Sequence, residues 1–159
     1  MTASSDEGRI RDLAMYLRRA LESVPRYKLP ITMQEFPRGA CGEASLLLGA
    51  LLADHGLHGF KYVSAARGRI DDGTWTSHAW LASGSLIVDI TADQFSDAPA
   101  AVIVARNSAW HDKFTIEKTH PSDFRATYSL GNGDLQALLV RLQAEFEGDV
   151  SGVDKRGEF

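Results

Sequence analysis

The sequence has one cysteine among its 159 residues, Cys41, and this scarcity limits the chemistry open to the chain. A disulfide needs two cysteines, so none can form within the chain. A single unpaired thiol suits a reducing compartment, where disulfides are rare. Cys41 therefore has to be interpreted through its reactivity or its packing.

Long apolar runs and basic runs are also missing. No apolar stretch approaches the ~18 residues that a membrane span requires, and residues 1–8 lack the basic and apolar regions of a secretory signal. Acidic residues outnumber basic ones by 21 to 17, and Lys and Arg form no stripe. These absences argue against a membrane or a nucleic acid as partner. They predict a cytoplasmic protein and leave export without a cleaved signal open.

Three segments have apolar residues at helical spacing. The predicted helices are residues 9–24, 41–55 and 134–147, of which the second is apolar around much of its circumference. The small polar residues 1–8 and the tail 148–159 are predicted to be disordered. With 44% apolar residues, the chain is expected to form one domain over residues 9–147.

The middle of the chain changes to the pattern of short strands. The predicted strands are residues 60–66, 74–82, 85–91 and 101–105, with a less regular one at 114–117. Asp71-Asp72-Gly73 and Ser83-Gly84 are turn signals, so neighbouring strands are expected to be antiparallel. Helices and strands are segregated along the chain, which predicts an α+β fold with the central helix packed on an antiparallel sheet.

Cys41 stands in a loop of small residues that leads directly into the central helix. A thiol attacks carbonyl carbons as thiolate. The unpaired backbone N–H groups of a first helical turn favour that negative charge. Gly39 and Gly42 let the backbone pass closely and leave space for a substrate carbonyl. The position is typical of a nucleophile.

His78 and Asp89 lie on two successive apolar strands. In a hairpin centred on Ser83-Gly84, His78 is expected directly across from Asp89. A carboxylate opposite an imidazole fixes its tautomer and stabilises its charged form. An aspartate among Leu86, Ile87, Val88 and Ile90 is costly unless it has such a partner. The order Cys41, His78, Asp89 therefore predicts a Cys-His-Asp nucleophile system.

Each of these residues also has an ordinary structural interpretation. A lone cysteine is commonly a small buried apolar residue, a strand histidine a hydrogen-bonded core residue, and an aspartate at a strand end a turn residue. The catalytic prediction depends on the three occurring together, in this order and register.

Five further residues are candidates for the oxyanion hole or the pocket. Gly42 and the side-chain amide of Gln34 are placed to help hold an oxyanion, and Gln94 to donate there or to orient His78. Trp80 and Trp110 are candidate pocket walls, although tryptophan often simply packs. His111 and His120 lack zinc-ligand spacing, so no metal site and no cofactor are predicted.

Several of these segments carry a family resemblance within residues 36–95. They are Gly39-Ala40-Cys41-Gly42-Glu43-Ala44-Ser45-Leu46-Leu47, Leu51-Leu52-Ala53-Asp54-His55-Gly56-Leu57, His78-Ala79-Trp80-Leu81 and Val88-Asp89-Ile90-Thr91. They resemble the transglutaminase-like branch of the papain-like cysteine enzymes. The resemblance implies a papain-like α+β fold, with Cys41 as nucleophile, His78 as general base and acid, and Asp89 as its orienter. Minimal bacterial members of the family use no cofactor.

Small members of that family include the leader peptidases of lasso-peptide maturation, which have no obvious counterpart of residues 91–95. The Arg38-Gly39-Ala40-Cys41 entry is also similar to arylamine N-acetyltransferases, but this chain is too short for their extra domain.

Two classes of function follow. The first is a cysteine enzyme that attacks an amide of a peptide or protein substrate through a thioester, as peptidase, deamidase or transglutaminase. The second is a non-catalytic protein-binding module on the same fold. A leader-peptide protease that needs a protein partner is a variant of the first. Residues 1–35 are open to interpretation as a lid, an arm or a partner surface.

Overall fold

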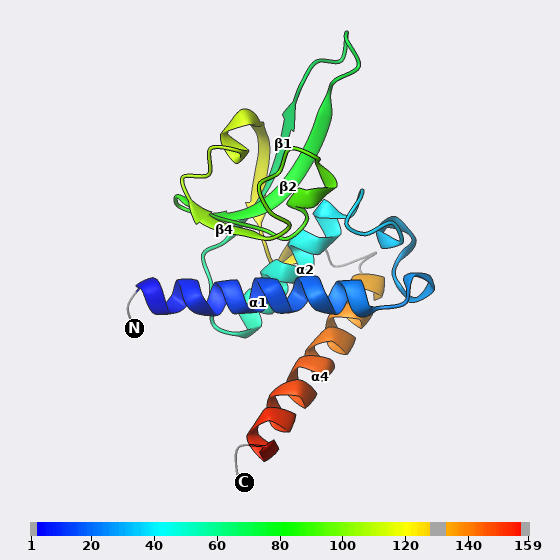
Figure 1. Ribbon diagram of the computed structural model, residues 1–159, viewed down its shortest axis with the longest axis vertical. Helices are drawn as coiled ribbons and strands as arrows, with labels where there is room; N and C mark the ends of the chain where they lie inside the picture. Colours follow the sequence, from blue (N-terminus) through cyan, green and yellow to red (C-terminus); the bar gives the residue numbers. More distant parts are fainter. Residues whose placement is uncertain (1–2, 128–132, 157–159) are drawn as a thin grey trace.

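The computed structural model describes residues 3–127 and 133–156, which form an α+β fold (Figure 1). The α-helices are α1 Ala3–Ser23, α2 Cys41–Asp54, α3 Phe124–Thr127 and α4 Gly133–Arg156. The strands are β1 Lys61–Arg67, β2 Thr76–Ser83, β3 Leu86–Asp89, β4 Ile103–Arg106 and β5 Thr115–Pro121. Four 3-10 helices connect them: η1 Arg26–Lys28, η2 Ile31–Met33, η3 Ala92–Gln94 and η4 His111–Lys113. Among the described helices, none is both long and apolar enough to cross a membrane.

The five strands form one antiparallel sheet in the order β4-β3-β2-β1-β5. Helix α2 packs on β2 and β1, and α1 and α4 pack on α2 (Figure 1). This arrangement confirms the predicted α+β class and antiparallel sheet.

Side-chain alternation along the strands divides the core into two parts. Leu81 and Val88 face α2, where they join the leucines of that helix in the larger cluster. Their neighbours Trp80 and Ile87 face the other way, into a second cluster with Trp110 and Phe114. Because His78 and Asp89 alternate in step with Trp80 and Ile87, both belong to this second face.

Helix α2 is apolar on nearly all sides because neighbours surround it. Leu47, Leu48, Leu51 and Leu52 are each at most 1% exposed. Gly49 lies on the side that meets the backbone before α3. A Cβ atom built on Gly49 would lie 2.7 Å from the carbonyl carbon of Ser122, which is backbone and cannot rotate away. Glycine therefore allows the close approach of α2 and this segment.

We expect Gly49→Ala to lower the free energy of unfolding by roughly 3 kcal/mol, because the added methyl group forces the backbone near Ser122 to move. Gly8→Ala is the matched control. Gly8 lies in α1 with open space around its Cβ position, so alanine there is expected to stabilise by up to ~1 kcal/mol. Urea denaturation of both variants measures the difference. Equal, small effects would contradict the close packing at Gly49.

The chain ends differ from the sequence prediction. Residues 1–8 were expected to be disordered, but α1 begins at Ala3, and residues 1–2 lie outside the described residues. Asp6 lies in its first turn, where a negative charge is favourable, and Glu7 pairs with Arg106 of β4, with Arg106 Nε 2.6 Å from Glu7 Oε1. The tail 148–159 was also expected to be disordered, but α4 continues to Arg156, and residues 157–159 lie outside the described residues. A glycine such as Gly148 costs a helix only about 1 kcal/mol relative to alanine.

The β2–β3 hairpin has a different register from the predicted one. Leu81 pairs with Val88 and Ser83 pairs with Leu86, so the turn is Gly84-Ser85. Gly84 has a φ of +57°, which glycine adopts readily. This register places Asp89 level with Trp80, and the predicted direct pairing of His78 with Asp89 is wrong. The shift of two residues keeps both side chains on one face, where they meet diagonally.

Candidate active site

Cys41 is the first residue of α2 and is partly exposed. The preceding Gly39 has a φ of +70°, a left-handed conformation that favours glycine and turns the chain into the helix. Ala40, at the N-cap, offers no side chain to the first-turn N–H groups. These groups lack intrahelical partners and give the helix start a partial positive charge beside the thiol.

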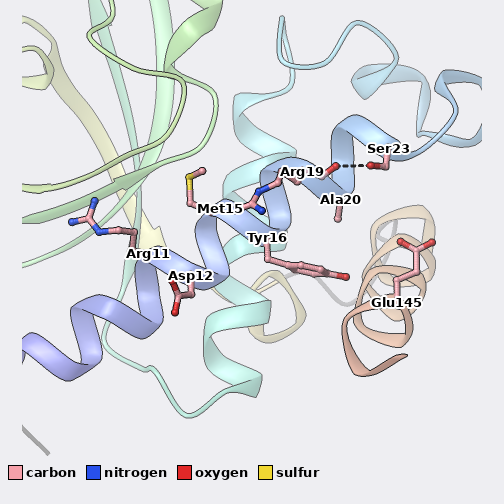
Figure 2. Close-up of a pocket in the computed structure, with 8 residues that line it drawn as sticks. All are labelled: Arg11, Asp12, Met15, Tyr16, Arg19, Ala20, Ser23 and Glu145. Atoms are coloured by element: carbon pink, nitrogen blue, oxygen red, sulfur yellow. Dashed lines mark hydrogen bonds between the residues drawn. The ribbon is translucent and has the colours of Figure 1, made fainter. Parts of the chain in front are cut away.

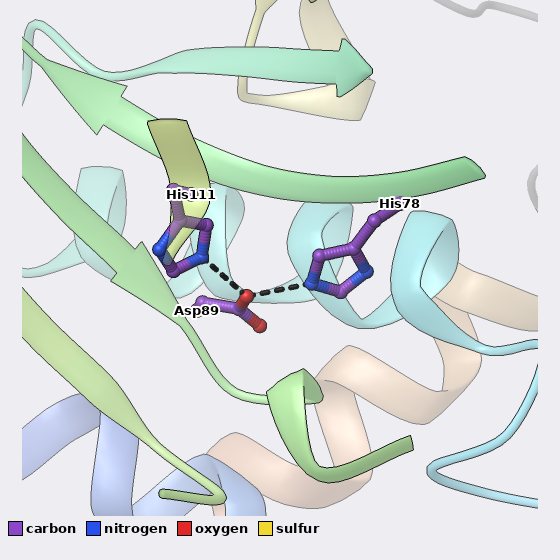
Figure 3. A group of neighbouring side chains, drawn as sticks. All are labelled: His78, Asp89 and His111. Carbon is purple, nitrogen blue, oxygen red and sulfur yellow. Dashed lines mark hydrogen bonds and ion pairs between the residues drawn. The ribbon is translucent and has the colours of Figure 1, made fainter. Parts of the chain in front are cut away.

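His78 and Asp89 form a buried pair on the second face of the sheet (Figure 3). The distance from His78 Nε2 to Asp89 Oδ2 is 2.6 Å, and neither side chain is exposed to solvent. Since the carboxylate accepts at Nε2, the other ring nitrogen, Nδ1, is the one that exchanges protons with a reacting group.

The charge of His78 is governed by burial, Asp89 and Cys41. Burial lowers the pKa of the imidazole, but the hydrogen bond to Asp89, the charge of Asp89 and the interactions with Cys41 outweigh it. Together they raise the pKa of His78 to about 9. At neutral pH His78 is therefore an imidazolium between Asp89 and Cys41, the state needed for an imidazolium–thiolate pair.

Asp89 is held ionised by three hydrogen bonds. Burial alone would raise the pKa of Asp89, but the bonds from His111, His78 and the backbone N–H of Thr91 lower it below its ordinary value. The distance from His111 Nε2 to Asp89 Oδ2 is 2.8 Å, and the distance from Thr91 N to Asp89 Oδ1 is 2.9 Å. Oδ2 thus accepts from two histidines, as Figure 3 shows.

Sequence reasoning missed His111. His111 was considered only as a zinc ligand and was rejected in that role. In the structure its side chain is buried against Asp89. Ser108 Oγ lies 2.6 Å from His111 Nδ1, so the serine hydroxyl donates there while Nε2–H donates to Asp89. The signal in the sequence is its setting, because His111 follows Trp110 and lies three residues before Phe114, both buried aromatic residues.

Gln94 lies beside the reacting nitrogen of His78. Gln94 Nε2 is 3.1 Å from His78 Nδ1 and 3.2 Å from the carbonyl oxygen of Thr91, which holds the amide in place. When the ring is neutral, Gln94 donates to Nδ1. Of the two roles considered for Gln94, this geometry favours orienting His78.

Aromatic rings enclose the histidines. Trp80, Phe95, Trp110 and Phe114 each lie with their ring centroids within 5.0 to 5.8 Å of that of His78. The guanidinium of Arg67 covers the Phe95, Trp110 and Phe114 rings from outside and makes two 2.9 Å bonds to Asp97. This shell excludes water and strengthens the electrostatic interactions inside it. Trp80 and Trp110 thus pack against His78 in the buried second cluster, and neither lines the cavity that contains Gln94.

Gly42 and Gln34, the two remaining candidates for the oxyanion hole, lie in different surroundings. A Cβ atom on Gly42 would lie 3.2 Å from the hydroxyl of Tyr62, so glycine admits this tyrosine beside the helix start. The carboxamide of Gln34 donates to the carbonyl of Leu29 at 3.3 Å and lines a separate cavity of about 400 Å³ with residues of α4. The expected placement of the Gln34 amide at the oxyanion is therefore unsupported, since a local loop carbonyl engages it.

His78, Asp89 and His111 are also the kinds of residue that bind a metal, and their ligand atoms lie within 4.8 Å of one another. Ligands of one zinc ion at about 2.1 Å in tetrahedral geometry are separated by ~3.4 Å. The two nitrogen–oxygen distances of 2.6 and 2.8 Å are shorter and correspond to hydrogen bonds. The group functions as a hydrogen-bond network in this arrangement.

Two cavities differ in their relation to this network. One of about 460 Å³ is lined by Gln94 and by Arg38, three residues before Cys41. A larger one, of about 610 Å³, lies along α1 near α4 (Figure 2). There Tyr16 extends from α1 toward α4, and its hydroxyl donates to the carbonyl of Leu142 at 2.9 Å. None of the residues lining this larger cavity belongs to the network, so the smaller cavity is the better candidate for substrate.

The chain matches no protein-family model, no curated protein sequence and no solved structure. Functional inference therefore depends on the geometry of Cys41, His78 and Asp89.

Proposed function

We propose that this protein is a cysteine enzyme that attacks amide carbonyls through a thioester, on a fold of the transglutaminase-like, papain-like kind. The observation that carries the proposal is the position of His78, whose Nε2 is bonded to buried Asp89 and which also interacts with Cys41 at the start of α2. Helix α2, with the nucleophile at its N-terminus and an antiparallel sheet beneath it, supports the fold assignment.

The first half of the reaction forms the thioester. The Cys41 thiolate attacks the carbonyl carbon, a C–S bond forms, and the electron pair moves to the carbonyl oxygen. First-turn N–H groups of α2 stabilise this oxyanion. His78 gives its Nδ1 proton to the amide nitrogen, the C–N bond breaks, and an amine or ammonia leaves.

The second half regenerates the enzyme. Neutral His78 accepts a proton at Nδ1 from water or an acceptor amine as it attacks the thioester, and the thiolate leaves when the C–S bond breaks. Gln94 keeps the ring oriented between the two halves. Water gives hydrolysis, by a peptidase or deamidase, and an amine gives transfer, by a transglutaminase. The relative access of water and amine decides between them.

The rate of Cys41 alkylation by iodoacetamide between pH 5 and pH 10 tests the proposal. A free thiol half-ionises near pH 8.5, so its rate falls about tenfold per pH unit below that value. We expect Cys41 to keep reacting rapidly at pH 6, and His78→Ala to lower that rate at least ~30-fold by removing the imidazolium partner. Every label reports on Cys41 because the chain has no other cysteine.

His58→Ala is the matched control, since His58 is exposed and takes no part in the network; we expect its profile to match the wild type. The comparison is made on folded His78→Ala, because an unfolded variant would titrate like a free thiol whatever the role of His78. Slow alkylation of the wild type, unchanged by His78→Ala, would contradict the enzyme and favour a binding module.

A further inference from the structure

The cavity of about 460 Å³ adjoins the reacting atoms. Gln94 forms part of its wall and touches His78 Nδ1. Phe36, Pro37 and Arg38 form another part, and Arg38 is joined to Cys41 by only Gly39 and Ala40. A substrate whose carbonyl meets Cys41 would therefore have a neighbouring group in this cavity.

Two arginines line the cavity, and neither is engaged in an ion pair within the described part of the chain. The guanidinium of Arg38 is exposed. Arg26, also in the wall, donates to a backbone carbonyl, that of Gln34, at 2.9 Å. Each arginine keeps N–H donors available to a ligand.

The wall also holds two carboxylates, and only one of them has an arginine partner within the described ranges. Asp93 is already paired with Arg18, whose Nη1 and Nη2 bond to its two oxygens at 2.6 and 2.8 Å. Glu35 is the other carboxylate of the wall. The wall thus holds two arginines and two carboxylates, and Arg18 is shared between Asp93 and Glu22. Both arginines of the wall lack an ion pair among the described residues, so their N–H donors suit an anionic ligand.

We propose that this cavity binds a carboxylate of the substrate through Arg38 and Arg26, so that the enzyme prefers acyl substrates with an acidic group close to the reacting carbonyl. This inference rests on the proposed function, and it names a substrate class for the same site. The carboxylate is either the side chain of Asp or Glu or the free C-terminus of a peptide. Arginine forms two parallel hydrogen bonds with either source.

Two alkylating reagents that differ in charge test the inference. Iodoacetate carries a carboxylate, and iodoacetamide is its neutral counterpart. We expect Arg38→Gln to lower the ratio of the iodoacetate rate to the iodoacetamide rate about five-fold, the size of one exposed charge interaction, with a smaller fall for Arg26→Gln. The imidazolium of His78 also attracts iodoacetate and raises the ratio in the wild type. The test therefore depends on how much Arg38→Gln changes the ratio, and not on the ratio of the wild type alone.

Arg19→Gln is the matched control, because exposed Arg19 lines the other cavity and its loss changes the net charge equally. Its ratio should stay at the wild-type value. An unchanged ratio in both Arg38→Gln and Arg26→Gln, with rapid iodoacetamide labelling, would overturn the carboxylate site and leave the enzyme proposal intact. Slow iodoacetamide labelling with a ratio that still depends on Arg38 would contradict the enzyme and keep the anion site.

Protection against iodoacetamide separates the two sources of the carboxylate. Acetyl-Ala-Glu-amide compared with acetyl-Ala-Gln-amide tests the side chain, and acetyl-Ala-Ala compared with acetyl-Ala-Ala-amide tests the C-terminus. We expect the acidic member of at least one pair to protect more strongly, and this advantage to disappear in Arg38→Gln. Equal protection within both pairs would overturn the preference for acidic substrates.

Discussion

Asp89→Asn is expected to lower the rate of Cys41 alkylation at pH 6.5 by up to roughly 100-fold, the difference between a fully ionised thiol and one that ionises near pH 8.5. Asp89 Oδ2 accepts from His78 at 2.6 Å and from His111 at 2.8 Å. Asparagine removes the negative charge that helps to raise the pKa of His78. It also presents an N–H donor that favours the wrong tautomer of the ring. The imidazolium–thiolate pair is then no longer stabilised.

His111→Phe is the control for this experiment, because it keeps the charge of Asp89 and the hydrogen bond that His78 donates to Asp89. We expect it to keep the alkylation rate within about tenfold of the wild type and to lower the free energy of unfolding by ~2 kcal/mol, since Asp89 loses one buried donor. A His111→Phe variant with the pH profile of Asp89→Asn would make His111 essential for positioning Asp89. An Asp89→Asn variant with the wild-type profile would make Asp89 purely structural.

The sequence predicted most elements of this fold because their signals are local. Helix α2 and the strands β1 to β4 depend on apolar spacing and on turn residues such as Gly84, and their observed bounds differ from the predicted ones by at most three residues. The register of the β2–β3 hairpin was predicted less accurately from the sequence. Moving the turn from Ser83-Gly84 to Gly84-Ser85 changes every pairing, yet it keeps the alternation that places His78 and Asp89 on one face.

The rest of the site depends on contacts between distant segments. His111 reaches Asp89 because β4 pairs with β3 and the chain then returns over the second face of the sheet. Gln34 turns toward Leu29 because both lie in the same irregular stretch of 3-10 turns, where a nearby carbonyl satisfies its amide. No spacing rule within the sequence encodes such contacts, whereas the Cys41–His78–Asp89 order could be read directly.

The raised pKa of His78 predicts how stability depends on pH. A histidine with an ordinary pKa near 6.5 and a pKa of about 9 in the fold contributes stability that is fully present below pH 6.5 and is lost as the pH rises through 9. This difference corresponds to about 3 kcal/mol. Asp89 acts in the opposite direction: its pKa is lowered, so its contribution is present above its ordinary value of 3.8 and is lost as the pH falls. The stabilising effect of the His78–Asp89 pair is therefore greatest between the ordinary pKa of aspartate, 3.8, and the ordinary pKa of histidine, 6.5.

Urea denaturation of the wild type and His78→Gln at pH 6 and pH 10 measures this contribution. The free energy of unfolding of the wild type should fall by ~3 kcal/mol more than that of His78→Gln over this interval, because only the wild type has the shifted imidazole. His58→Ala should behave like the wild type, since His58 is exposed and its loss leaves His78 and Asp89 in place. Parallel pH dependence of the wild type and His78→Gln would mean that His78 is neutral in the fold. In that case Cys41 has no cationic partner at neutral pH, and the imidazolium–thiolate pair that begins the proposed reaction does not form.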